Sequence, residues 1–203
     1  MFLYPCIIKC WRMNEASLRR VLVEIFRLAY VRRLVDLFGG NASARLSDDE
    51  VLITPTSMPK ILIKPQSIVK MRLDGTVVSG GKPSSEWRMH VSIYRVRDDV
   101  KFILHTHPPN ILALTQAGYR IDLSLSEATS YIGEVAEVPY LKPGSAELAD
   151  AVGRALSRGN VTAVILRNHG LVTVGSTPYE ALNRAEVLED LAYITLMMKL
   201  LGR

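Results

Sequence analysis

The chain has 203 residues, of which 48% are hydrophobic and 22% charged, with a formal net charge of +5. This length fills one well-packed domain and is too short for two comfortable ones. No apolar run reaches the roughly twenty residues that span a bilayer, and no basic residue precedes the opening apolar segment as in a secretory signal, so we expect a cytoplasmic protein that does not enter a membrane.

The positive charge does not indicate nucleic-acid binding. Lys and Arg are scattered among acidic residues, with no basic run and no interleaved aromatic stripe. A modest positive field instead suits an anionic small substrate, because it raises the local concentration and the association rate of that substrate.

Residues 1–12 read as an apolar, aperiodic N-terminal extension, and residues 13–203 as a single domain. Cys6 and Cys10, the only cysteines, fall in the extension. Without a second Cys or His pair at finger spacing they do not form a zinc module, and packed side chains or a surface thiol pair are expected instead. Met13 is an alternative start of the chain.

The first half of the domain is predicted to be a helix followed by a small antiparallel meander. Asn14 is a suitable N-cap, and the helix is expected to continue to about Phe38, where two glycines end it. Short apolar or alternating runs then predict strands, with an Asp-Gly turn before the last of them; these strands are residues 41–46, 51–54, 68–73 and 76–79.

The second half alternates helices and extended segments. Helices are expected at residues 84–96 and 110–117, and from Ser145 to about residue 156. Extended segments are expected at residues 100–107, 136–140, 161–166 and 171–174.

The last helix has a clear start and an apolar end. Thr177, Pro178 and Glu180 form the pattern of a capping box with proline at the first helical position. Near the C-terminus, apolar residues cover almost the whole circumference of the predicted helix, and a single chain can hardly bury apolar side chains on all sides of a helix. We interpret this end as a subunit contact, with a buried core helix as the alternative.

Three of the four histidines stand where a catalytic metal would need them. His105 and His107 lie two apart at the end of a predicted strand, so their side chains project from one face. His169 follows another strand in an Asn-His-Gly turn, where Gly170 is expected to adopt positive φ. Three neutral imidazoles without a nearby cysteine match a catalytic zinc site better than a structural one. Another divalent metal, or ordinary histidines in a strand and a turn, are the alternatives.

Next to these segments are loops suited to an anion and a carboxylate suited to proton transfer. Three loops, residues 39–43, 54–57 and 82–85, carry small hydroxyl or amide side chains, and Ser84 is expected at a helix start, where backbone N–H groups bind phosphate. Ordinary turn and cap chemistry is the alternative. Glu86 is expected in the first turn of that helix and is the candidate general base. His90, four residues on, is interpreted as a partner that supports the site or as a satisfied core histidine.

Together these segments resemble the class II aldolase/adducin family, in the branch that contains L-fuculose-1-phosphate aldolase. The resemblance covers the chain from Asn14 almost to the C-terminus. It rests on five motifs in the family's order and near its spacing, namely Gly40-Asn-Ala-Ser-Ala-Arg45, Ile53-Thr-Pro-Thr56, Gly81-Lys-Pro-Ser-Ser-Glu-Trp-Arg-Met-His90, Leu104-His-Thr-His107 and Asn168-His-Gly-Leu-Val172.

The resemblance implies a three-layer α/β/α fold around a largely antiparallel central sheet. It also implies a homotetramer with one zinc ion per subunit near a subunit interface. Zinc is then held by His105, His107 and His169, while Glu86 moves the substrate proton and can fill the fourth metal position before substrate arrives. The residues that the resemblance assigns to the substrate phosphate are Asn41, Thr56, Ser57, Ser84 and Ser85.

Two positions depart from the family pattern. The anion loop has Thr56-Ser57 where the family commonly has Ser/Thr-Gly, so a backbone contact there must tolerate a side chain. The tyrosine that protonates the aldehyde oxygen in the family corresponds to Leu125 or its neighbours. Tyr131 and Glu127 are the candidate acids nearby, with simple packing as the alternative for both.

The function expected from this resemblance is that of a zinc-dependent aldolase, a carbon–carbon lyase of carbohydrate metabolism. It would cleave a sugar phosphate such as L-fuculose 1-phosphate to dihydroxyacetone phosphate and a small aldehyde. The alternatives are L-ribulose-5-phosphate 4-epimerase, methylthioribulose-1-phosphate dehydratase and a non-catalytic adducin-like scaffold. Intact ligand histidines and Glu86 argue against the scaffold, and the natural aldehyde stays open.

Overall fold

The computed structural model describes residues 13–202, and the predicted extension with Cys6 and Cys10 lies outside that range. The described chain builds one eight-stranded sheet in the order β4-β3-β2-β1-β5-β8-β7-β6. Every neighbouring pair is antiparallel except β6 and β7. The strands are β1 Asn41–Arg45, β2 Glu50–Ile53, β3 Val69–Arg72, β4 Val77–Ser79, β5 Phe102–Thr106, β6 Glu134–Val138, β7 Val161–Leu166 and β8 Gly170–Gly175.

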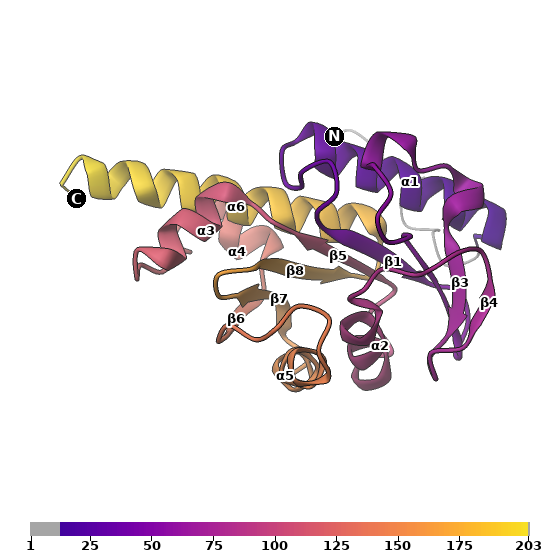
Figure 1. Ribbon diagram of the computed structural model, residues 1–203. Helices are drawn as coiled ribbons and strands as arrows, with labels where there is room; N and C mark the ends of the chain where they lie inside the picture. The colour runs from indigo at the N-terminus through magenta and orange to yellow at the C-terminus, as the bar shows by residue number, and fades with distance from the viewer. Residues whose placement is uncertain (1–12, 203) are drawn as a thin grey trace, which may run out of the picture.

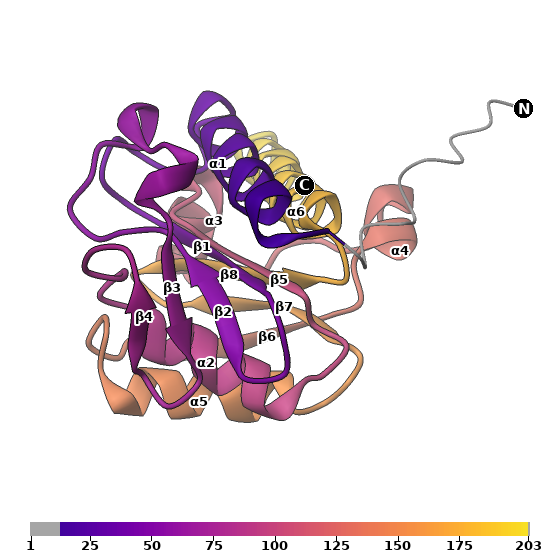
Figure 2. The same cartoon turned by 90° about the vertical axis from the view of Figure 1, so that its right-hand side faces the viewer.

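Helices cover both faces of this sheet, which confirms the predicted three-layer α/β/α class (Figures 1 and 2). One face carries α1, α3, α4 and α6, and the other carries α2 and α5. Two separate apolar clusters fill the spaces between the layers. The helices are α1 Glu15–Val31, α2 Trp87–Val96, α3 Pro109–Gln116, α4 Ser126–Tyr131, α5 Ala146–Leu156 and α6 Pro178–Leu200, with short 3₁₀ helices at Lys60–Leu62 and Pro65–Ser67.

The alternation of side chains along β1 and β5 decides which residues face α2. Ala42 and Leu104 belong to the apolar cluster under α1 and α6, whereas Ile103 belongs to the cluster under α2 and α5. Because neighbouring residues of a strand point to opposite faces, Asn41 and His105 point toward α2, and the two are directly paired across the strands. The site described below is built on this pairing.

Three predicted helix starts are confirmed by their caps. The side chains of Asn14, Ser145 and Thr177 accept hydrogen bonds from backbone N–H groups in the first turns of α1, α5 and α6. The capping box predicted for α6 is only half formed, however. The Glu180 carboxylate accepts from the backbone N–H and hydroxyl of Ser176, one residue before the cap.

Two predicted helix boundaries are wrong. The first helix ends at Val31 rather than near Phe38, because Arg33 adopts a left-handed φ of 60° and the chain turns back toward the sheet. Leu34, which is buried, follows this turn and accepts a hydrogen bond from the backbone N–H of His107. The apolar residues past Val31 thus extend the core without extending the helix.

The helix predicted from Ser84 begins only at Trp87. Glu86 occupies the N-cap position with φ −98° and ψ 15°, so it precedes the first turn. The chain before it is held extended, because Ser84 N–H donates to the carbonyl of Thr54 and Pro83 forms a bridge with Pro55. Ser84 therefore does not stand at a helix N-terminus, and its backbone N–H is already used by the carbonyl of Thr54.

The end of α6 extends past the sheet (Figure 1). Its last turns expose Tyr193, Ile194, Met198, Leu200 and Leu201, with Leu200 77% exposed. The alternative interpretation, a helix buried in the core, therefore does not hold for the end of α6 within one chain. The subunit contact predicted there stays a prediction. Within residues 13–202, no helix is both long and apolar enough to span a membrane.

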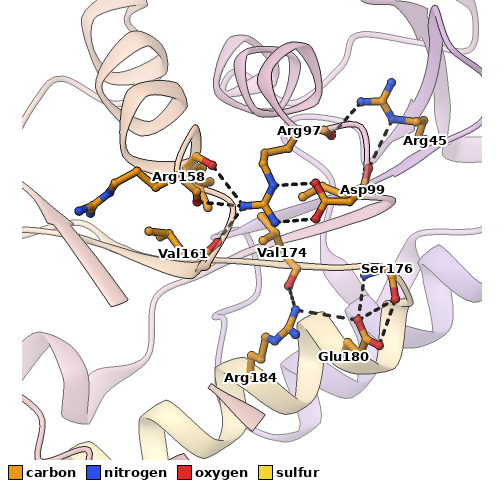
Figure 3. Close-up of polar contacts among 11 residues, drawn as sticks. Arg45, Arg97, Asp99, Arg158, Val161, Val174, Ser176, Glu180 and Arg184 are labelled. Atoms are coloured by element: carbon orange, nitrogen blue, oxygen red, sulfur yellow. Dashed lines mark hydrogen bonds and ion pairs between the residues drawn. The ribbon is translucent and has the colours of Figure 1, made fainter. Parts of the chain in front are cut away.

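A buried arginine, Arg97, holds two connections together near the start of β5 (Figure 3). Arg97, only 7% exposed, donates through Nη1 to the carbonyls of Leu156, Arg158 and Val161 at 3.0–3.3 Å. Its other nitrogens donate to the Asp99 carboxylate at 2.6 and 2.7 Å. Arg97 therefore ties the connection between α5 and β7 to the connection between α2 and β5.

Candidate active site

The three predicted metal ligands meet at one end of the sheet. His105 ends β5 on the α2 face, His107 follows that strand, and His169 lies in the turn between β7 and β8. One nitrogen of each ring lies within 4.8 Å of the others. The Nε2 atoms of His105 and His107 are 3.1 Å apart. His169 thus meets two histidines that stand 62 and 64 positions before it in the chain.

A backbone contact orients the ring of His105. The Nδ1 of His105 lies 3.0 Å from the carbonyl oxygen of Leu171. Because a carbonyl only accepts, Nδ1 carries a proton, and Nε2 faces the centre. This arrangement is the usual one for a metal-binding histidine.

The glycine after His169 has a different role from the one predicted. Positive φ falls on Asn168, at 55°, and not on Gly170. A Cβ at Gly170 would lie 2.3 Å from the carbonyl oxygen of Thr106, 2.9 Å from Cδ2 of His107 and 3.1 Å from Cε1 of His105. Gly170 is therefore required by the close approach of the two histidine rings, while the turn itself is made by Asn168.

Glu86 completes the cluster from the α2 side. Its Oε2 lies 3.0 Å from Nε2 of His105, and its Oε1 lies 3.4 Å from Nε2 of His169. The residue is 6% exposed, and Oε1 has no hydrogen-bond partner in the described structure. A carboxylate and three imidazoles thus face a shared, nearly dry centre.

The ionisation of these groups follows from their burial and their mutual contacts. Burial, together with the charge of His105, lowers the pKa of His107 to about 3 and that of His169 to about 4. For Glu86, burial raises the pKa, but the charge and hydrogen bond of His105, with contributions from His169 and Asn41, outweigh it and hold the pKa well below its usual range. The protein therefore presents His107 and His169 as neutral ligands beside an ionised carboxylate at neutral pH.

These residues fit a divalent metal. Facing nitrogens at 3.1 Å cannot both be proton acceptors without a shared cation or proton between them. The unpartnered Oε1 of Glu86 points to the same need. Three imidazoles with an oxygen ligand in reach are the donor set of catalytic zinc sites, in which the metal–nitrogen distance is about 2.0–2.1 Å.

The loops predicted to hold an anion lie together next to Glu86. The bridge between Pro55 and Pro83 joins the second and third loops, and Thr56 N–H donates to the carbonyl of Lys82 at 3.2 Å. The Thr54 hydroxyl accepts from the N–H of Ala42 at 3.1 Å, which attaches both loops to β1. Three loops far apart in the chain thus form one surface.

The predicted phosphate residues differ in how accessible they are. Ser57, in a left-handed conformation with φ 55°, and Ser85 are exposed, and Thr56 is half-buried. Ser84 is buried, and its hydroxyl accepts from the N–H of Glu86 at 3.3 Å. The side-chain amide of Asn41 is also buried and has both ends hydrogen-bonded within the protein, to His90 and to Glu86.

Tyr131 and Glu127, the candidate acids, are not brought to the histidines of the same chain. They lie in α4, just before β6, whose first residue Glu134 pairs with Val161 at the start of β7. Since β6 and β7 are parallel, α4 is at the opposite end of these strands from His169. Tyr131 is 54% exposed.

Two buried residues next to the site were not identified from the sequence. Ser43 contacts His90 and Tyr94 through its hydroxyl. The pattern of β1 contains the signal, because Asn41 and Ser43 alternate with the apolar Ala42 and Ala44 and must therefore face the same side. Tyr94 lies four residues after His90 on α2, which puts both on one helix face.

A mixed sheet between two helical layers, with three histidines at one end that could hold a metal ion, is an arrangement of the class II aldolase type. The family model described as "Class II Aldolase and Adducin N-terminal domain" matches residues 20–196. The chain belongs to this family, as the sequence motifs indicated.

Curated relatives carry two different activities. The chain is 34% identical over 179 residues to the L-fuculose phosphate aldolase of Methanocaldococcus jannaschii, covering 88% of this chain and 96% of that protein. It is 34% identical over 191 residues to the 3-oxo-tetronate 4-phosphate decarboxylase of Cupriavidus necator, covering 92% and 87%. Both relatives are lyases by name.

Among solved structures, YgbL of Klebsiella pneumoniae is similar over most of its length. The two chains share 31% identity with a TM-score of 0.84, covering 92% of this chain and 91% of YgbL. YgbL is itself only proposed to be an aldolase, epimerase or decarboxylase. The family is thus settled, whereas the substrate is a separate question.

Proposed function

We propose that the protein is a zinc-dependent lyase that acts on a sugar phosphate and passes through the enediolate of dihydroxyacetone phosphate. The leading substrate is L-fuculose 1-phosphate or a close analogue, cleaved to dihydroxyacetone phosphate and a small aldehyde. The observation that carries this proposal is the convergence of Glu86 with the three histidine Nε2 atoms. This cluster lies beside the three loops at residues 39–43, 54–57 and 82–85, called the joined loops below.

Each part of the site has one task in this reaction. The joined loops, through Thr56, Ser57, Ser84 and Ser85, hold the phosphate and so fix the carbonyl carbon near the histidines. His105, His107 and His169 would hold the metal, which when bound polarises the substrate carbonyl and stabilises negative charge on it. Glu86 exchanges the proton on the carbon next to the carbonyl.

The bond changes balance as follows. The substrate's C4 hydroxyl loses its proton, the C3–C4 bond breaks, and C4 becomes the aldehyde carbon. The bonding electrons pass into the C2 carbonyl and give the enediolate. Glu86, which is ionised at the start, takes up one proton and delivers it to C3, which yields dihydroxyacetone phosphate. The proton released by the C4 hydroxyl balances the one that Glu86 consumes.

The aldolase reaction also needs a group that accepts the proton of the C4 hydroxyl of the substrate. Tyr131 and Glu127 are far from the histidines of their own chain, so either could act only at a site on another copy. This is consistent with the proposed homotetramer, for which the exposed end of α6 is a candidate contact. Neither candidate is assigned within one chain.

A decarboxylase acting on 3-oxo-tetronate 4-phosphate is a second candidate, favoured by a specific observation. Loss of CO2 from this 3-oxo acid breaks the C1–C2 bond and sends its electrons into the C3 carbonyl, which gives the same enediolate. No hydroxyl proton has to be removed. Leu125, which stands at or near the position of the family's tyrosine, is compatible with this reaction, and decarboxylase relatives reach 34% identity.

A direct product assay separates the two candidates. Purified protein with one equivalent of zinc is given L-fuculose 1-phosphate or 3-oxo-tetronate 4-phosphate, and formation of dihydroxyacetone phosphate is followed with a coupled dehydrogenase. Release of lactaldehyde supports the aldolase, and release of CO2 supports the decarboxylase. Glu86→Gln should largely spare metal binding and remove most turnover with either substrate. Activity that persists in this variant would show that the assigned base is wrong.

A further inference from the structure

A continuous line of buried polar side chains runs from the interior of α2 to Glu86. The Tyr94 hydroxyl lies 2.9 Å from Ser43 Oγ, which lies 2.6 Å from Nδ1 of His90. Nε2 of His90 lies 2.5 Å from Oδ1 of Asn41, and Nδ2 of Asn41 lies 3.0 Å from Oε2 of Glu86. All five residues are 6% exposed or less.

The chemistry of these groups fixes the direction of every hydrogen bond in this line. Asn41 Nδ2 donates to Oε2 of Glu86, which leaves the carbonyl oxygen of Asn41 facing His90. That oxygen only accepts, so His90 must carry its proton on Nε2. Its Nδ1 is then a bare acceptor for the Ser43 hydroxyl, and Tyr94 must donate to Ser43.

The surroundings support this assignment. Burial, with the charge of His105, lowers the pKa of His90 to about 3, so its ring is neutral at physiological pH. Burial raises the pKa of Tyr94 well above its usual range, so its hydroxyl keeps the proton that it donates. The opposite histidine tautomer would place two acceptors, Nε2 of His90 and Oδ1 of Asn41, 2.5 Å apart.

Only one carboxylate oxygen of Glu86 accepts a hydrogen bond from this line of polar side chains. Oε2 accepts from Asn41, whereas Oε1 is buried and has no hydrogen-bond partner among the described residues. The two oxygens of one carboxylate are thus made unequal by side chains that are remote from the substrate.

We propose that Tyr94, Ser43 and His90 are positioning residues that act through Asn41 to fix Oε2 of Glu86, leaving Oε1 as the oxygen that exchanges the substrate proton. The inference rests on the proposed role of Glu86 as the base. It adds a defined histidine tautomer and a purpose for three buried polar residues that do not touch the histidine cluster. It also gives Asn41 a role in holding the base.

The tautomer is tested without reference to activity. The chain contains four histidines, so ¹⁵N-histidine labelling followed by solid-state NMR gives few signals, and His90→Gln identifies the one from residue 90. We expect His90 to be neutral and protonated on Nε2 from pH 5 to 8. A ring protonated on Nδ1, or a doubly protonated ring in this range, overturns the proposal.

The positioning role is tested by a matched pair of variants. In His90→Gln the side-chain amide can donate to Asn41 and accept from Ser43, as the histidine does, whereas His90→Leu has a similar size and can do neither. We expect His90→Leu to lower kcat about 10- to 100-fold, the usual cost of losing such a supporting contact, with KM changed less. His90→Gln should recover most of this loss. Equal kcat values for the two folded variants overturn the proposal.

A variant at Tyr94, the other end of the line, keeps the proposal testable if the variants at position 90 do not fold. Tyr94→Phe removes only the terminal hydroxyl and should lower kcat by a smaller factor, while Tyr119→Phe, at a half-exposed ring away from the line, should not. Unchanged kcat in Tyr94→Phe counts against the line. The failure of the proposed function is distinguishable, because it appears as full turnover in Glu86→Gln whatever the His90 variants do.

Discussion

Replacing Gly170 with alanine tests whether the close approach at this residue positions the metal ligands. The added Cβ would meet the Thr106 carbonyl oxygen at 2.3 Å, with Cδ2 of His107 and Cε1 of His105 at 2.9 and 3.1 Å. Thr106 is paired with Leu171 in the sheet, so its carbonyl cannot shift without disturbing β5 and β8. The φ of Gly170 is not positive, so the cost is purely steric.

Overpacking of this kind costs about 1–3 kcal/mol. For a domain of this size each 1 kcal/mol corresponds to roughly 2–4 °C in Tm. The same displacement moves two ligand rings, so we also expect Gly170→Ala to retain less than half of the metal per chain after dialysis. Denaturant unfolding and elemental analysis measure the two effects.

Gly159→Ala is the matched control, because a Cβ there has no neighbour within 4 Å. Its metal content should equal that of the wild type. A Gly170→Ala protein with wild-type stability and full metal content would refute the argument that the ring positions depend on this glycine.

Three further predictions concern stability. Burial lowers the pKa of Lys60 from 10.5 to about 8 in the folded protein. Between these two pH values the unfolded chain binds more protons than the folded protein, so the free energy of unfolding rises as the pH rises from about 8 toward 10.5. Relative to Lys60→Met, the wild type should therefore gain about 2 kcal/mol between pH 7 and 9.5, and parallel pH profiles in urea unfolding would contradict this. Arg97→Met removes a hydrogen-bond donor shared by three carbonyls and should cost about 3 kcal/mol or more. Arg158→Met changes a mostly exposed side chain and should stay within about 0.5 kcal/mol; equal losses in the two variants would refute a buried structural role of Arg97. Chelation should lower Tm and excess zinc restore it, since a ligand at 100 times its Kd adds about 2.7 kcal/mol, and a Tm insensitive to both would argue against the metal site.

The parts of the site that the sequence could predict are those that depend on local periodicity. The two-residue spacing of His105 and His107 on a strand was enough to place both at one centre. Glu86 was identified by its place between the serine pair and His90, although the helix expected from Ser84 starts three residues later, at Trp87. These features need only the repeat of a strand or a helix.

The parts that could not be predicted depend on contacts between distant segments. The first helix was extended too far because Leu34 and Val35 continue its apolar pattern, whereas the structure uses them to pack against the sheet. The role of Gly170 depends on the pairing of β5 with β8. The line through Ser43 depends on the register of β1 against α2, which one sequence does not specify.

The central claim is that Glu86, beside a metal held by three histidines, exchanges the proton of a bound dihydroxyacetone phosphate. The most direct measurement is deuterium uptake into this compound alone, in deuterium oxide with one equivalent of zinc, followed by proton NMR. The account predicts exchange of one hydroxymethyl hydrogen by the wild type and almost none by Glu86→Gln with equal metal content. It predicts this result whether the natural substrate is an aldol or a 3-oxo acid. Absence of exchange in the zinc-loaded wild type, or equal exchange in the two proteins, would contradict it.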